Sequence, residues 1–91
     1  MDHLWTKTER LASRPYPLNI EQDSLADGRT VYLARNRDLP GCKSQGVTIG
    51  EVVANLSQAR ADYIYALLTS DLPVPEPSPR LGLIAQTRRD S

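Results

Sequence analysis

Several acidic side chains in this sequence could act as general acids or bases, or as ligands for divalent metal ions. They are Glu21, Asp23, Asp27, Asp38, Glu51 and Asp62. Two-metal hydrolysis requires such carboxylates to converge on one site. Most of them have a local structural use instead: Asp23 and Asp27 favour turns, and Asp38 is expected to accept hydrogen bonds within the Pro-Gly turn that follows it. We therefore expect no catalytic cluster and no enzymatic activity.

The chain has one histidine, His3, and one cysteine, Cys42. Without a second histidine or cysteine, it has no set of side chains for a zinc site or for a nucleophile–base pair. The single cysteine also forms no intramolecular disulfide. Cys42 lies in a predicted strand with no helix N-terminus beside it to stabilise a thiolate, so we expect a buried, unreactive thiol. No metal ion or other cofactor is predicted.

Arg35, Arg37 and Lys43 could form a basic patch on neighbouring strands. Apart from Tyr32, no aromatic residue interleaves with them, which favours a solvated sheet edge over a platform for stacked bases. Eleven basic and eleven acidic side chains give a formal net charge of zero, so the whole molecule provides no field that attracts nucleic acid. DNA binding by this chain alone is not expected.

A tight turn and a helix start lie close together in the middle of the chain. Pro40 presets φ at the second turn position and Gly41 permits a positive φ at the third, which predicts a type II turn over residues 39–42. Thr48 is a good N-cap, and Glu51 is placed to return a hydrogen bond to the cap nitrogen. The residues between them, 42–45, alternate as in a short strand.

Two further strands are predicted before this turn. Leu18 and Ile20 alternate with polar residues over 16–21, and Val31 and Leu33 alternate with their neighbours over 31–34, as in half-buried strands. Residues 23–28 supply the turn between them. With the strand over 42–45, the first half of the chain becomes a three-stranded antiparallel meander.

Two helices are predicted. Apolar residues recur at three- and four-residue spacing from Thr48 to about Thr69, so one face of a long helix covers the sheet. Its other side leaves Tyr65 and Ala61 either as a subunit contact or as ordinary exposed residues. Residues 2–13 predict a short amphipathic helix, which packs either on its own domain or, through Trp5, on a neighbouring subunit.

The proline-rich run over residues 72–79 excludes a helix. It is either a polyproline ligand or, as we favour, a stiff connection to a last strand over 81–86. The predicted fold class is therefore α+β, with the order β-β-β-α-β preceded by a short N-terminal helix. We divide the chain into a helical leader (1–15), one small domain (16–86) and a polar tail (87–91).

The pattern D-L-P-G-C-x-S-x-G-x-T-x-x-E, from Asp38 to Glu51, followed by an apolar helix, resembles the N-terminal domain of HicB-like antitoxins. The resemblance covers about residues 16–79. It implies a partial ribonuclease H fold without catalytic carboxylates, which binds a HicA-like, mRNA-cleaving ribonuclease toxin. The DNA-binding segment of many relatives has no counterpart here, so the chain resembles a single-domain member. Arg35 and Arg37 depart from the neutral or acidic residues that many relatives have there.

The resemblance implies an antitoxin that occludes the active site of its toxin. The candidate partner contacts are Tyr32, Arg35, Arg37 and Tyr65. The residues of the structural motif are Asp38, Leu39, Pro40, Gly41, Thr48 and Glu51. The alternative is a stand-alone homo-oligomeric interaction or regulatory module without a toxin partner.

A small core, with apolar side chains such as Trp5 and Leu68 left over, predicts a homodimer or higher oligomer. No run of apolar residues is long enough for a signal peptide or a membrane span. This predicts a cytoplasmic protein without membrane contact.

Overall fold

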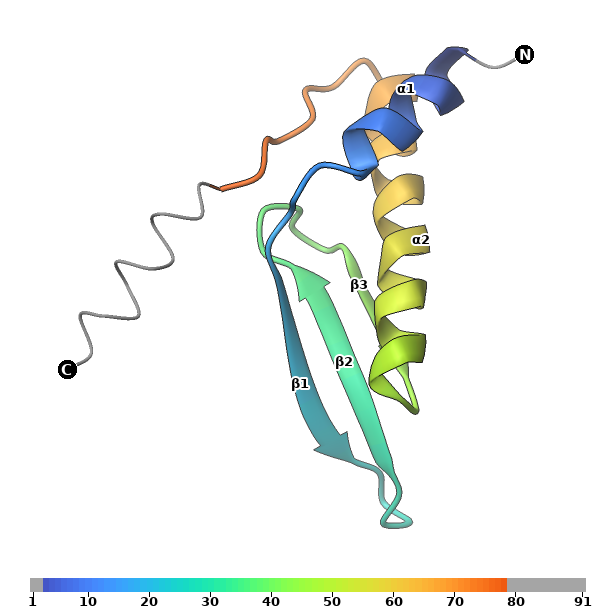
Figure 1. The fold of residues 1–91 in the computed structure, drawn as a ribbon, viewed down its shortest axis with the longest axis vertical. Coiled ribbons are helices and arrows are strands. Elements are labelled where there is room, and N and C mark those ends of the chain that lie inside the picture. Colours follow the sequence, from blue (N-terminus) through green and yellow to red (C-terminus); the bar gives the residue numbers. More distant parts are fainter. Residues whose placement is uncertain (1–2, 79–91) are drawn as a thin grey trace, which may run out of the picture.

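The structure, a computed structural model, describes residues 3–78. It contains helix α1 (His3–Ala12), strands β1 (Leu18–Ser24), β2 (Thr30–Asn36) and β3 (Lys43–Gly46), and helix α2 (Ile49–Thr69) (Figure 1). The strands form an antiparallel sheet in the order β1-β2-β3. The predicted α+β class, with its N-terminal helix, meander and long helix, is confirmed. The predicted last strand over residues 81–86 and the polar tail lie outside the described residues.

The turn between β2 and β3 has the predicted geometry. Gly41 has φ of 88°, and the Cys42 N–H donates to the carbonyl of Leu39 at 2.9 Å, closing the four-residue reversal. The Leu39 side chain is fully buried, with 0% of its surface exposed. The turn thus anchors the end of the sheet in the core as well as reversing the chain.

Thr48 caps α2, as predicted, because its hydroxyl accepts a hydrogen bond from the Glu51 N–H at 3.0 Å. The prediction for the Glu51 side chain was wrong by one residue. Its carboxylate accepts from the N–H of Val47, at 2.6 Å, rather than from the cap nitrogen of Thr48. Gly46 lies just before this cap, where an added Cβ would come within 2.8 Å of the Val52 nitrogen, so β3 approaches α2 closely there.

Helix α2 packs on β2 and β3 and does not reach β1. The core between helix and sheet contains Val52, Leu56 and Ile64 from α2 and Ala34 from β2. An α-helix is about 10 Å wide and strands lie about 4.8 Å apart, so one helix covers two strands. This leaves β1 as an overhanging edge strand.

The predicted burial of the first two strands was wrong. Leu18 and Ile20 do lie on the helix side of β1, but they remain 38% and 37% exposed because α2 stops short of them. On β2 the inward residues are Ala34 and Asn36, both 2% exposed, whereas Leu33 lies on the opposite face. The turn fixes this register, since the Asn36 N–H donates to the carbonyl of Cys42.

Helix α1 packs on α2 of the same chain (Figure 1). Thr8 and Ala12 are buried in this contact. The rings of Trp5 and Tyr65 meet edge to face with their centroids 5.4 Å apart. Of the two positions considered for the N-terminal helix, the chain therefore adopts the one on its own domain.

After α2 the proline-rich run forms a non-helical strap over residues 72–78. The Tyr16 hydroxyl donates to the carbonyl of Pro75 and accepts from Arg14 at 2.6 Å. The Asp38 carboxylate accepts from both the N–H and the hydroxyl of Ser78, each at 2.6 Å. Asp38 was expected to act within its own turn; it instead ties the strap to the end of the sheet.

Candidate protein-binding site

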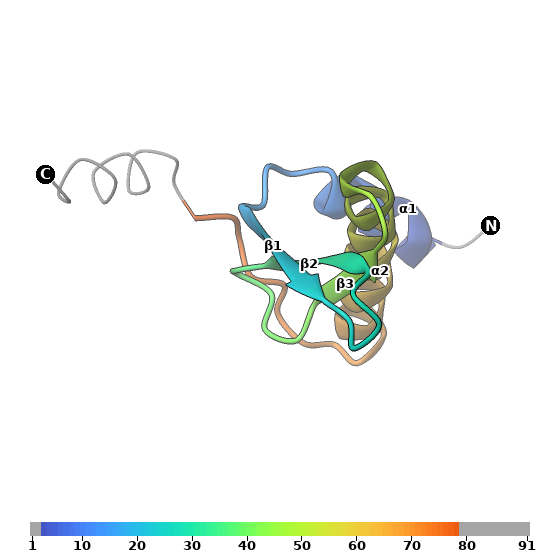
Figure 2. The ribbon, with the colours of Figure 1, turned by 90° about the horizontal axis from the view of Figure 1, so that it is seen from below.

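Within residues 3–78, no helix covers one of the two faces of the sheet. Ser44 marks the covered face, because its hydroxyl donates to the carbonyl of Val52 in α2 at 2.9 Å. Its cross-strand partner Ala34 shares that face, and the residues directly before and after each of them in the strands point the other way. Both helices lie on one side of the sheet when it is seen along the strands (Figure 2). We call the uncovered side the open face; its residues are Asn19, Glu21, Asp23, Val31, Leu33, Arg35, Lys43 and Gln45.

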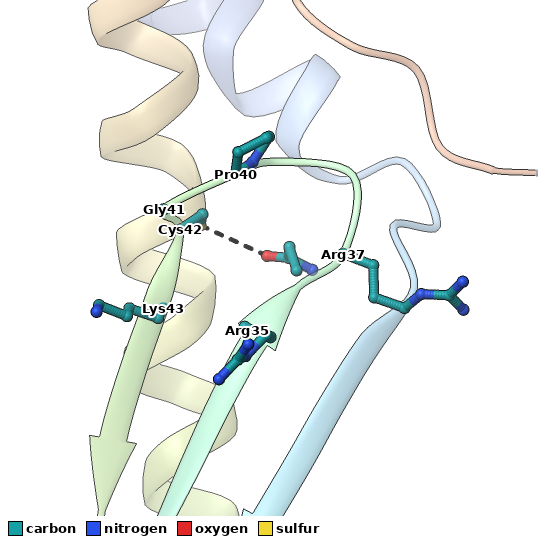
Figure 3. A pocket seen from close by; sticks show the side chains of 7 residues that line it. Arg35, Arg37, Pro40, Gly41, Cys42 and Lys43 are labelled. Atoms are coloured by element: carbon teal, nitrogen blue, oxygen red, sulfur yellow. Dashed lines mark hydrogen bonds between the residues drawn. The ribbon is translucent and has the colours of Figure 1, made fainter.

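The open face has a basic pole near the turn. Arg35 and Lys43 are direct cross-strand partners, and Arg37 follows at the end of β2 (Figure 3). All three residues are exposed. Within residues 3–78 none of the three forms an ion pair. Like charges placed directly opposite each other destabilise a sheet, so this arrangement leaves cationic groups available to a partner.

A shallow pocket lies at the basic pole. It has a volume of about 330 Å³ and is lined by the three cationic residues together with Asn36, Pro40, Gly41 and Cys42. The turn gives the pocket its wall, and Figure 3 shows the three basic side chains spreading from it in different directions. None of the described residues that line it carries a carboxylate. The pocket is therefore suited to an acidic group of a partner.

The open face also has an acidic pole, on β1. Glu21 lies directly opposite Leu33, and Asp23 lies opposite Val31, one pair further from the turn. Leu33 in turn lies opposite Gln45 on β3. The two half-buried apolar residues of β2, Val31 and Leu33, thus lie beside the acidic residues. Glu21 is also the diagonal cross-strand neighbour of Arg35, so the two poles meet beside Leu33.

The structure does not join the four predicted partner contacts into one surface. Arg35 and Arg37 lie together at the basic pole. Tyr32 lies on the covered face, between Gln22 and Gly46, and is half-buried against the core. Tyr65 packs against Trp5 on the helix side.

Sequence reasoning placed Lys43 beside the arginines, but it did not find the acidic pole. Glu21 was assigned to a polar position of the first strand, but the assignment of Asp23 to the following turn was wrong, because β1 extends to Ser24 and includes Asp23. What was missing was the register, which sets them on the same face as Arg35. The cross-strand register is not encoded in the alternation of either strand by itself.

The acidic side chains that could do chemistry are dispersed. Asp27 pairs with Arg29 at 2.7 Å, and Asp38 holds Ser78. Glu51 is engaged at the start of α2, and Asp62 accepts from Gln58 one turn earlier in the helix. Over residues 3–78 no three His, Cys, Asp or Glu side chains gather where they could hold a metal ion.

Cys42 is buried, as predicted, with 3% of its surface exposed. Its thiol donates to the Asn36 side-chain oxygen at 3.6 Å, and Arg60 donates to the same oxygen at 3.3 Å. Burial raises the pKa of the Cys42 thiol, while the charge of Arg60 opposes this effect. Cys42 therefore belongs to the packing of the turn, not to a reactive site.

The chain matches no known protein family, no curated protein and no solved structure. In the part of the chain that the structure describes, no helix has the length and apolar character needed to cross a membrane.

Proposed function

We propose that this chain is a non-catalytic, HicB-like antitoxin that binds and occludes a HicA-like, mRNA-cleaving ribonuclease in the cytoplasm. The observation that carries the proposal is the open face, a rigid sheet surface that no described helix covers and that exposes unpaired charges beside apolar residues. The D-L-P-G turn and the Thr48 cap, which support the resemblance, have the expected backbone geometry.

The proposed mechanism is steric. The sheet lies over the active site of the ribonuclease, with Leu33 as the apolar contact and the charged poles setting the orientation. Arg35 and Lys43 meet acidic groups of the toxin, while Glu21 and its neighbour Asp23 meet basic ones. Charge complementarity of this kind raises the association rate and selects the partner, while buried apolar contacts supply most of the affinity.

A co-expression experiment tests this function. The chain is expressed with a HicA-like ribonuclease encoded beside it, and growth of the host is measured. The double substitution Arg35→Glu with Lys43→Glu reverses the basic pole and is expected to abolish rescue. Lys7→Glu with Arg10→Glu is the matched control, because it makes the same charge change at exposed positions of α1 and is expected to leave rescue intact. Rescue by both variants, or a wild-type chain that fails to bind the toxin in a pull-down, would contradict the proposal.

The alternative function, a homo-oligomeric interaction module without a toxin partner, is favoured by one observation. The open face carries both charges in separate regions, so it is complementary to itself. The absence of an adjacent gene for a small basic ribonuclease, together with self-association of the purified chain, would select this alternative.

A further inference from the structure

We infer that the open face is a homodimer interface, in which a second copy of this chain docks with its acidic pole against the basic pole of the first. The inference deepens the homo-oligomeric function. It concerns the isolated chain, so it stands or falls independently of any toxin. The charges on the open face favour a second copy of the chain as its partner, and the area of the face limits the affinity.

Two-fold symmetry satisfies the charges on this face. In a symmetric dimer each contact occurs twice, so residue i of one copy meets residue j of the other and the reverse. An axis passing near Leu33, between the poles, sets Glu21 and Asp23 of one copy against Arg35 and Lys43 of its partner. Two copies of Leu33 then meet near the axis and lose their contact with water.

The same charges disfavour other occupants. A nucleic acid or a phosphorylated ligand drawn to Arg35 and Lys43 would also lie near Glu21. Glu21 is on the strand next to that of Arg35 and lies diagonally across from it. Strands are about 4.8 Å apart, which is well inside the screening length of about 8 Å at physiological salt. Anionic polymers are therefore repelled by half of the face, whereas a second copy supplies the opposite charge at both poles.

The area predicts a weak dimer. A seven-residue strand is about 23 Å long, and three strands span about 14 Å, so the flat area of the face is about 320 Å² per copy. With side chains the total buried surface stays below about 1,200 Å², which is the range of transient complexes. We expect a dissociation constant in the micromolar range, and strong weakening by salt because charges at the rim are screened.

Charge-reversed variants that are mixed together provide the test. Glu21→Lys with Asp23→Lys makes the face wholly basic, and Arg35→Glu with Lys43→Glu makes it wholly acidic. Sedimentation at low salt is expected to show reversible dimers of the wild type, whereas each variant alone stays monomeric because like charges then face each other. An equimolar mixture of the two variants is expected to form a heterodimer at least tenfold tighter than either variant with itself.

Lys7→Glu with Arg10→Glu changes exposed charge on α1 and should leave dimerisation unchanged. Circular dichroism verifies that each variant is folded; if a double variant is not, the single changes Glu21→Lys and Arg35→Glu enter the same mixing test. The inference is overturned if the wild type is monomeric at about 500 µM, far above a micromolar dissociation constant. It is overturned equally if the mixture associates no better than its components.

Discussion

Gly41 shows how one residue sets the geometry of the turn. Its φ of 88° lies in the left-handed region, and a Cβ added there would meet no heavy atom within 4 Å. Replacement by alanine is therefore penalised by the backbone conformation alone, and we expect Gly41→Ala to lower the free energy of unfolding by about 1 kcal/mol.

Urea denaturation measures this effect, and Gly50→Ala is the matched control. Gly50 lies in α2, has no positive φ, and also has open space for a Cβ. Alanine favours a helix over glycine by up to about 1 kcal/mol, so the control is expected to shift the midpoint in the opposite direction. A Gly41→Ala protein as stable as the wild type would contradict the turn assignment.

Because the thiol of Cys42 is buried, we expect the stability of the fold to depend on pH. Burial raises the pKa of its thiol in the folded state, so on raising the pH the unfolded chain loses the proton first. The contribution of the neutral thiol is complete below the unfolded pKa of about 8.5 and is lost as the pH rises from there through the folded pKa. Between about pH 7 and pH 9.5, the urea midpoint of the wild type should fall more than that of Cys42→Ala. Equal slopes for the two proteins would show that burial does not disfavour the thiolate.

At the scale of the elements, the strap over residues 72–78 depends on Asp38. Removing the carboxylate with Asp38→Ala leaves the N–H and hydroxyl of Ser78 without their acceptor, and we expect a loss of stability of about 1 kcal/mol or more. Hydrogen exchange of the Ser78 amide should accelerate by more than the global change. Asp62→Ala, which removes an exposed carboxylate on α2 that accepts from Gln58, should leave that exchange rate unchanged.

The elements were predictable from sequence because each has a local cause. Thr48 caps its helix through its own side chain, and Pro40 with Gly41 makes the turn whatever surrounds it. The faces of the strands were not predictable. Whether Leu18 is covered depends on how far α2 extends across the sheet, and whether Ala34 or Leu33 faces inward depends on the register fixed at Asn36.

Only the part of the candidate site that depends on local sequence was predictable. Arg35 lies in β2 and Arg37 directly follows the last residue of that strand, so the two arginines lie close together whenever the strand forms. Tyr65 was assigned to an interface because its helical side carries few charges, but α1 supplies Trp5 to cover it. A helix that precedes the sheet in sequence gives no local sign of the surface on which it will pack.

For the whole molecule, the balance of charge predicts weak contact with nucleic acid. With a formal net charge of zero and acidic residues on the face that carries the basic pole, the isolated chain cannot neutralise the roughly six to ten phosphates that give strong, salt-dependent binding. We expect no binding of short duplex DNA at physiological salt in a fluorescence-anisotropy titration. Submicromolar affinity would instead favour a repressor.

The anchoring of the strap also determines how the fold responds to mechanical force. Pro17, just before β1, accepts from the Arg37 N–H at 3.2 Å, and Ser78 is held by the adjacent Asp38. Tension applied between residues 17 and 78 therefore acts at a single corner of the sheet. The hydrogen bonds between β1 and β2 then open one after another from the end at Leu18 instead of resisting together in shear, so the domain should yield at low force in an optical trap.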